Sequence, residues 1–100
     1  MEFKTIQEAC VNNAINYGKE FNVKIDEDFA LLKLFEELGE FSQAVLINRK
    51  KSRPEKFISA EIAKAEVAKE LADVIGMVFV NAQLLNIDLE EALRKKWMKK

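Results

Sequence analysis

The sequence predicts an all-α protein that folds as a single domain over residues 1–100. Three glycines and one proline are too few for the many tight turns of a small β-sandwich or barrel. Apolar residues recur instead at the three- and four-residue spacing of amphipathic helices. Because hydrophobic residues make up 49% of the 100-residue chain and charged residues 33%, the composition is that of a globular chain with one hydrophobic core.

The first two predicted helices each begin near polar residues that favour a helix N-terminus. Thr5, with Glu8 three residues later, matches a capping box, which predicts a helix over about residues 6–21. The acidic run of residues 26–28 suits the positive end of a helix dipole. Since the apolar pattern then continues without a breaker, we expect a longer second helix over residues 29–48.

The second half of the chain predicts a loop and two further helices. Residues 49–53 lose the apolar periodicity, and Pro54 disfavours helix at the residue before it. Ser59 can cap a third helix that extends to about residue 85. Asp88, with Glu91 at the third helical position, predicts a short fourth helix that ends among the C-terminal cations.

Residue types that are missing exclude several kinds of site. The chain has no histidine, which excludes an imidazole general base and every zinc or iron site that needs histidine. Its single cysteine, Cys10, cannot form a disulfide within the chain, so we expect a core residue in a reducing compartment.

Charge and hydropathy predict a cytoplasmic protein with no nucleic-acid partner and no membrane. The net charge of -1 provides no overall field for binding a polyanion. The N-terminal residues lack a signal-peptide pattern, and the apolar run 71–85 is shorter than the roughly 20 residues that span a bilayer. Nucleic-acid binding by the basic segments 49–53 and 94–100 is a minor alternative, because such runs are usually solvated.

The second predicted helix separates apolar from charged residues. At 100° per residue, one arc is apolar and comprises Leu31, Leu34, Phe35, Leu38, Phe41 and Val45. Lys33, Glu36, Glu40 and Gln43 lie opposite, and Glu37 falls at the border. Glu37 and Glu40 are three residues apart, which places their carboxylates on neighbouring turns of one face.

The third predicted helix carries acids within an otherwise apolar stretch. Glu66, Glu70 and Asp73 form one stripe, and residues 71–85 are apolar around most of the helix, which is typical of a helix surrounded by protein. Two like charges about 4 Å apart repel by roughly 4 kcal/mol at an effective dielectric constant of 20. A cation is therefore expected beside these acids, and only Lys69 lies near them on the same helix.

Two interpretations of the acids follow from their spacing. If the second and third helices pack antiparallel, Glu37 and Glu40 meet Glu70 and Asp73, and four hard oxygen donors of this kind select Mg²⁺ or Mn²⁺. Alternatively, residues 49–51 or a lysine of the fourth helix neutralise the acids as ordinary ion pairs.

Two acidic motifs then resemble a known family. The segments Glu36-Glu37-Leu38-Gly39-Glu40 and Glu70-Leu71-Ala72-Asp73 resemble the EExxE…ExxD motif of the MazG-type, all-α nucleoside triphosphate pyrophosphohydrolases, and residues 86–93 resemble the turn and short helix that follow it. The resemblance covers about residues 31–100, although the stretch between Glu40 and Glu70 is longer than usual. It implies a four-helix MazG-like bundle in which two long antiparallel helices carry the acids. It also implies a core completed by oligomerisation, as a homodimer or a dimer of dimers.

The resemblance also implies roles for individual residues. The metal ligands would be Glu37, Glu40, Glu70 and Asp73, and Glu36 would join them as a further catalytic acid. Lys96 matches a family lysine near the substrate phosphates, with Lys95 and Lys99 as its neighbours. A favourable helix C-terminus explains these lysines equally well. Glu66, one turn before Glu70, is a second-rank ligand candidate.

The implied activity is Mg²⁺-dependent hydrolysis of a nucleoside triphosphate, NTP or dNTP, to the monophosphate and pyrophosphate, with a possible role in cleaning the nucleotide pool. One alternative is phosphoribosyl-ATP pyrophosphohydrolase, which performs the same type of reaction. Another is a non-catalytic helical oligomer or adaptor. The base preference is open, and residues with suitable chemistry for base recognition are Asn12, Asn13, Asn16, Tyr17, Phe41 and Trp97.

Overall fold

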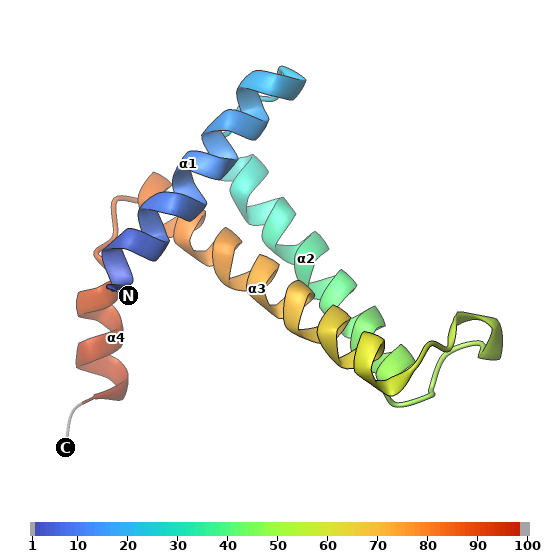
Figure 1. Cartoon of the computed structure of the whole chain (residues 1–100). Coiled ribbons are helices and arrows are strands. Elements are labelled where there is room, and N and C mark those ends of the chain that lie inside the picture. Colours follow the sequence, from blue (N-terminus) through green and yellow to red (C-terminus); the bar gives the residue numbers. More distant parts are fainter. Residues whose placement is uncertain (1, 99–100) are drawn as a thin grey trace.

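The computed structural model describes residues 2–98, which form four α-helices and one short 3-10 helix, with no strand in that range (Figure 1). The elements in chain order are α1 (Phe3–Phe21), α2 (Glu27–Asn48), η1 (Pro54–Lys56), α3 (Ala60–Leu84) and α4 (Leu89–Trp97). The all-α prediction with four helices is therefore confirmed.

Helices α2 and α3 form a long antiparallel pair, and α1 crosses them near the end away from the loop (Figure 1). The buried core residues are mostly small, which lets the helices approach closely, and they are Ala30, Ala44, Ala63, Val74, Phe79, Val80 and Ala82. The Asn81 side-chain amide donates a hydrogen bond of 2.9 Å to the carbonyl oxygen of Ala30. This bond fixes α3 against the first turns of α2.

Helix α1 begins three residues earlier than its sequence predicts. It starts at Phe3, and its N-cap residue Glu2 makes no side-chain capping bond, so the predicted capping box at Thr5 is wrong. The ring of Phe3 lies edge-on to Phe79 of α3, with ring centroids 5.2 Å apart and an interplanar angle of 88°. This contact with α3 favours an additional turn that local capping signals do not predict.

A tight turn connects α1 to α2. Asn22 adopts a left-handed conformation with φ 54°, and its N–H and that of Val23 both donate to the carbonyl oxygen of Gly18. A Cβ atom at Gly18 would lie 2.7 Å from both Ile25 Cγ1 and the Val23 oxygen, so the turn requires glycine there. Asp26 then caps α2 by accepting a 2.9 Å bond from the Phe29 N–H, and the helix starts two residues before the predicted position.

The caps predicted for the last two helices are confirmed. Ser59 accepts a hydrogen bond from the Ile62 N–H at 3.3 Å, and Asp88 accepts one from the Glu91 N–H at 3.0 Å. Helix α4 has no buried residue and projects from the end of α3 beside the N-terminus of α1 (Figure 1).

Within residues 2–98, no single helix has the length and hydropathy needed to cross a membrane. Among the described helices, α3 and α4 taken together pass such a test, but a bend of 112° separates them.

One side of the α2–α3 pair exposes large apolar side chains to solvent. We call this surface the apolar face, and it comprises Leu31, Phe35, Leu38, Leu71 and Ile75. The sequence predicts that α3 is enclosed by protein over residues 71–85, yet in one chain Leu71 is 46% exposed and Ile75 is 48% exposed. The α3 residues that one chain does bury include Val74, Phe79 and Val80. The chain alone therefore leaves this side of the pair uncovered.

Candidate active site

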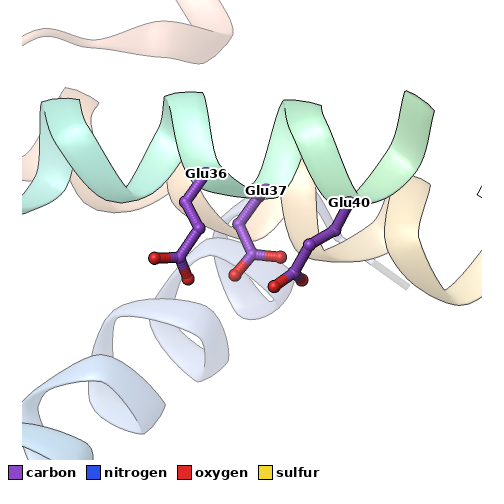
Figure 2. A group of neighbouring side chains, drawn as sticks. All are labelled: Glu36, Glu37 and Glu40. Atoms are coloured by element: carbon purple, nitrogen blue, oxygen red, sulfur yellow. The ribbon is translucent and has the colours of Figure 1, made fainter. Parts of the chain in front are cut away.

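Three acids of α2 lie close together. Figure 2 shows Glu36, Glu37 and Glu40 projecting from the same side of the helix. One carboxylate oxygen of each lies within 4.8 Å of the other two. The helical spacing of these residues therefore brings three possible ligands to one point on α2.

Two acids of α3 join this group through Glu37. Carboxylate oxygens of Glu37, Glu70 and Asp73 also lie within 4.8 Å of one another. Glu37 thus belongs to both groups, and we call the five residues together the acidic cluster. The convergence expected from antiparallel helices is present, whereas the catalytic and metal-binding roles of these residues stay predictions.

Glu37 is the most enclosed member of the acidic cluster. It is only 8% exposed, and its Oε2 atom is buried without a hydrogen-bond partner. The Oε2 atom of Glu70 is also buried and unpartnered. Because an unpaired buried carboxylate costs several kcal/mol, these two oxygens favour a bound cation between α2 and α3.

Lys33 supplies part of the missing positive charge. Its Nζ atom lies 2.6 Å from Glu36 Oε1 and 4.0 Å from Glu37 Oε1. The other ion pairs among residues 2–98 join Arg53 to Glu55 in the loop and cations to acids within α4. The alternative in which the basic loop or α4 neutralises the cluster is therefore not seen among the described residues.

The crowded acids change the protonation of the cluster. Burial, followed by the negative charges of Glu40 and Asp73, raises the pKa of Glu37 to about 7. Burial and the same two charges raise the pKa of Glu70 as well. The hydrogen bond to Glu36 raises the pKa of Lys33. Without a metal ion, Glu37 therefore holds a proton over part of the neutral range, and a bound cation would displace it.

The donor set fits a hard divalent cation. Glu37, Glu40, Glu70 and Asp73 offer only carboxylate oxygens, which Mg²⁺ and Mn²⁺ prefer over nitrogen or sulfur. The two unpartnered buried oxygens supply a physical reason for an ion to occupy this position. The residues present thus fit the metal that the sequence predicts.

A cavity of about 550 Å³ opens directly beside the acidic cluster. We call it the first cavity, and residues of α1, α2 and α3 form its wall. The lining residues are Ala9, Cys10, Asn13, Ala14, Tyr17, Phe29, Lys33, Glu37, Ala72, Asp73, Gly76, Met77 and Val80. Cys10, predicted as a core residue, is half-buried in this wall.

A second cavity, of about 520 Å³, lies on the loop side of the cluster and is bordered by Glu40 and Glu70. Glu66 and Gln43 also line it. Glu66 thus lies beside the acidic cluster without being among the acids that converge, which agrees with its second rank as a ligand candidate.

Comparison with known protein families gives a match that covers most of this chain. The model of the phosphoribosyl-ATP pyrophosphohydrolase family matches residues 17–96, which include the whole acidic cluster. The chain belongs to this family. Because phosphoribosyl-ATP pyrophosphohydrolases are MazG-like all-α proteins, the predicted resemblance is confirmed. Neither the curated proteins nor the solved structures gave a match.

Membership of the phosphoribosyl-ATP pyrophosphohydrolase family makes the chain a pyrophosphohydrolase of a nucleotide-like substrate. The matched range begins at Tyr17, so it includes the last turn of α1 and all of α2 and α3. Residues 3–16 of α1, which form much of one wall of the first cavity, lie outside the match.

Two of the three lysines predicted to bind substrate, Lys95 and Lys96, are not beside the acidic cluster. Lys95 and Lys96 are exposed on α4, and Lys95 Nζ lies 3.7 Å from Glu91 Oε1 of the same helix. Neither residue lines the two cavities, and α4 projects away from α2 (Figure 1). Lys99 lies outside the described residues. A phosphate-binding role for these lysines stays a prediction.

Sequence reasoning missed Lys33 as part of the site. Lys33 lies opposite the apolar arc of the second predicted helix, a position typical of a solvated side chain. The cation expected near the acids was Lys69. The signal was the spacing of Lys33 to Glu36 and Glu37, three and four residues apart, which brings side chains together on a helix. Phe29, Gly76 and Met77 were also missed as cavity residues, because only the crossing of α1 over α2 and α3 makes the cavity.

Proposed function

We propose that this chain is a Mg²⁺-dependent nucleoside triphosphate pyrophosphohydrolase that hydrolyses an NTP or dNTP to the monophosphate and pyrophosphate. The observation that supports it is the meeting of Glu37, Glu70 and Asp73 from two helices, with a buried and unpartnered oxygen on Glu37. Family membership supports the pyrophosphohydrolase reaction. The cavity beside the acids offers room for the rest of a nucleotide.

The carboxylates have distinct tasks in this proposal. Glu37, Glu40, Glu70 and Asp73 hold the metal, which when bound neutralises phosphate charge and acidifies a water ligand. Because these acids come from both α2 and α3, the metal they hold would bind the triphosphate where the two helices meet. Glu36 or Glu40 accepts the proton of the attacking water, a step typically worth about 10²–10⁴-fold in rate.

A second candidate function is phosphoribosyl-ATP pyrophosphohydrolase activity. The family match itself favours this substrate, and the reaction breaks the same kind of bond. The acidic cluster serves both substrates equally, so the choice depends on what the cavity accepts.

One experiment separates these functions. Products are measured from the common NTPs and dNTPs, non-standard nucleotides and phosphoribosyl-ATP, with Mg²⁺, with Mn²⁺ and without metal, and pyrophosphate and orthophosphate are detected separately. We expect metal-dependent pyrophosphate with an equal amount of the monophosphate. Turnover of phosphoribosyl-ATP alone establishes the second candidate. A folded protein that binds no metal and turns over nothing favours the helical adaptor.

The same proposal includes self-association through the apolar face. Five large apolar side chains on one side of α2 and α3 are exposed, and burial of such surface drives association. A second copy of the chain offers an equally apolar partner in a symmetric dimer. Light scattering at micromolar concentration tests this, since a monomer contradicts it.

Three further expectations remain part of the proposal. We expect a cytoplasmic location, no nucleic-acid partner and no association with membranes. Cell fractionation, a gel-shift assay at low salt and vesicle co-sedimentation test them in turn.

A further inference from the structure

We propose that the first cavity binds the nucleoside part of the substrate and that Asn13 and Tyr17 of α1 recognise its base. The inference rests on the proposed function, because it places the phosphates at the acidic cluster. It adds a location for the base and the residues that select it.

The first cavity joins the acidic cluster without a break. Glu37 and Asp73 belong to both, and Lys33 lies at the same border. Away from this border most of the wall is apolar or small, with Phe29, Met77 and several alanines. A volume of about 550 Å³ falls within the usual range of small-molecule sites, which combine an apolar lining with a few polar groups. A ligand whose phosphates reach the acids would therefore place its uncharged part in this cavity.

Two polar side chains of α1 face the cavity. Asn13 and Tyr17 are four residues apart, so they lie one above the other on the same face of α1, and both line the cavity. Among residues 2–98, neither side chain takes part in a hydrogen bond. The amide of Asn13 offers both donors and an acceptor, and Tyr17 offers a hydroxyl. These groups suit the edge of a nucleobase, which also presents donors and acceptors.

An aromatic wall lies beside these polar groups. The rings of Tyr17 and Phe29 have centroids 6.2 Å apart and are tilted by 33°. Flat heteroaromatic rings pack favourably against such side chains in offset or tilted arrangements. The cavity thus combines a surface for the face of a base with hydrogen-bonding groups for its edge.

Gly76 of α3 leaves the cavity open. A Cβ atom there would meet only Cys10 Sγ, at 3.9 Å, which is an ordinary contact. Packing of the chain therefore does not require glycine at this position, although glycine is a poor helix former. The absence of a side chain keeps free the space that the base would occupy.

The α1 wall is a feature of this chain outside the family match. Ala9, Cys10, Asn13 and Ala14 precede the matched range, which begins at Tyr17. The acidic cluster lies inside the match. The acids that would carry catalysis thus lie within the part that the family model describes, whereas Asn13, one of the two residues that would recognise the base, lies outside it.

The test compares a nucleotide with a ligand that has no base. Binding of α,β-methylene nucleoside triphosphates and of inorganic tripolyphosphate is measured by calorimetry with Mg²⁺. We expect the preferred nucleotide to bind at least tenfold more tightly than tripolyphosphate. Gly76→Leu fills the cavity and should remove this preference while tripolyphosphate binds within twofold of wild type. Ala65→Leu, at an exposed α3 position outside both cavities, is the matched control and should change neither affinity.

Two milder variants test recognition without filling the cavity. Asn13→Ala and Tyr17→Phe should each reduce the affinity ratio between the best and the worst base several-fold. If Gly76→Leu also loses tripolyphosphate binding, the test rests on Asn13→Ala and Tyr17→Phe. An unchanged ratio of base affinities in both variants then overturns the inference.

The outcomes separate this inference from the proposed function. Equal binding of nucleotide and tripolyphosphate by the wild-type protein overturns the inference and leaves the function of the acids intact. Metal-dependent binding of neither ligand overturns the proposed function, and the inference with it.

Discussion

The two sides of the α2–α3 pair differ in what each lacks. One side carries the acidic cluster, where buried oxygens of Glu37 and Glu70 have no partner. The other is the apolar face, where Leu38 is 41% exposed and Phe35 is 63% exposed. A single chain brings the residues of each side together but leaves both sides without a binding partner. The missing group is different in the two cases, because unpaired carboxylates favour a cation whereas exposed apolar side chains favour another apolar surface.

The comparison explains why α2 has few fully buried residues. Its buried positions are Ala30, Glu37 and Ala44, which point toward α3. Its exposed large residues Leu31, Phe35 and Leu38 belong to the apolar face, on the opposite side from Glu36 and Glu40. The helix therefore packs small residues against α3 and leaves Leu31, Phe35 and Leu38 exposed for contacts outside the chain. A metal on one side and a second copy on the other would complete both surfaces independently.

The largest expected effect follows from removing a charge from the acidic cluster. Glu40→Gln and Asp73→Asn keep the size of the side chain but lose a metal ligand, so pyrophosphate release should fall by at least about 10²-fold. Circular dichroism should show an unchanged helical fold. Glu8→Gln, which removes a negative charge at an exposed position of α1, is the control. Undiminished turnover in either variant removes that residue from the site.

Placing a charge on the apolar face should have the next largest effect. Burial of a large apolar side chain is worth about 1.5–3 kcal/mol, and a symmetric dimer contains each position twice. Leu38→Asp should therefore raise the dissociation constant of the dimer by at least about 10²-fold. Light scattering across a dilution series measures this. Ile15→Asp, at an exposed position of α1, is the control, and equal dissociation in the two variants would place the interface elsewhere.

Sequence patterns predicted the elements whose signals are local. Ser59 and Asp88 cap α3 and α4 as expected, because a side-chain oxygen and a backbone N–H three residues later need no distant partner. The start of α1 was wrong because a contact between Phe3 and Phe79, far apart in the sequence, extends the helix beyond its local signal. Packing between helices cannot be read from the spacing within one of them.

For the candidate site, too, the sequence predicted which acids meet but not how packing between helices encloses them. The spacing of the acids and the antiparallel arrangement were sufficient to predict that Glu37 meets Glu70 and Asp73. The burial of Glu37 was not predictable, because a helical wheel placed it at the border of the apolar arc and only the position of α3 decides its exposure. The first cavity was likewise hidden, since three helices form it together.

The pH dependence of stability should distinguish the charged side from the apolar one. The pKa of Glu37 is about 7 in the folded protein and about 4.5 when unfolded, so the folded state binds this proton more tightly. Its stabilising contribution is therefore full below pH 4.5 and is lost as the pH rises through 7. In EDTA, the free energy of unfolding should fall by on the order of 3 kcal/mol between pH 5 and pH 8 because of this residue.

Urea denaturation at pH 5, 6, 7 and 8 measures this dependence. Glu37→Gln should flatten it, and Mg²⁺ should stabilise the wild-type protein more at pH 8 than at pH 5, because the ion replaces the proton. Leu38→Asp, which changes the apolar face, serves as the control and should retain the slope at a fixed state of association. Parallel curves for the wild-type protein and Glu37→Gln would show that Glu37 does not carry the effect.

The smallest expected effect concerns the cation that already lies beside the acids. Lys33 Nζ is 4.0 Å from Glu37 Oε1, so in the free protein it partly replaces a metal and also repels one that approaches. A unit charge at this distance contributes about 1 kcal/mol in a water-like medium, which corresponds to roughly fivefold in affinity. Lys33→Met should therefore tighten Mg²⁺ binding by a few-fold, measured by calorimetry at pH 8, whereas Lys64→Met on the exposed surface of α3 should not. Weaker Mg²⁺ binding in Lys33→Met would mean that the lysine chiefly holds the carboxylates in their binding positions, and the charged side would then be organised by Lys33 before any metal arrives.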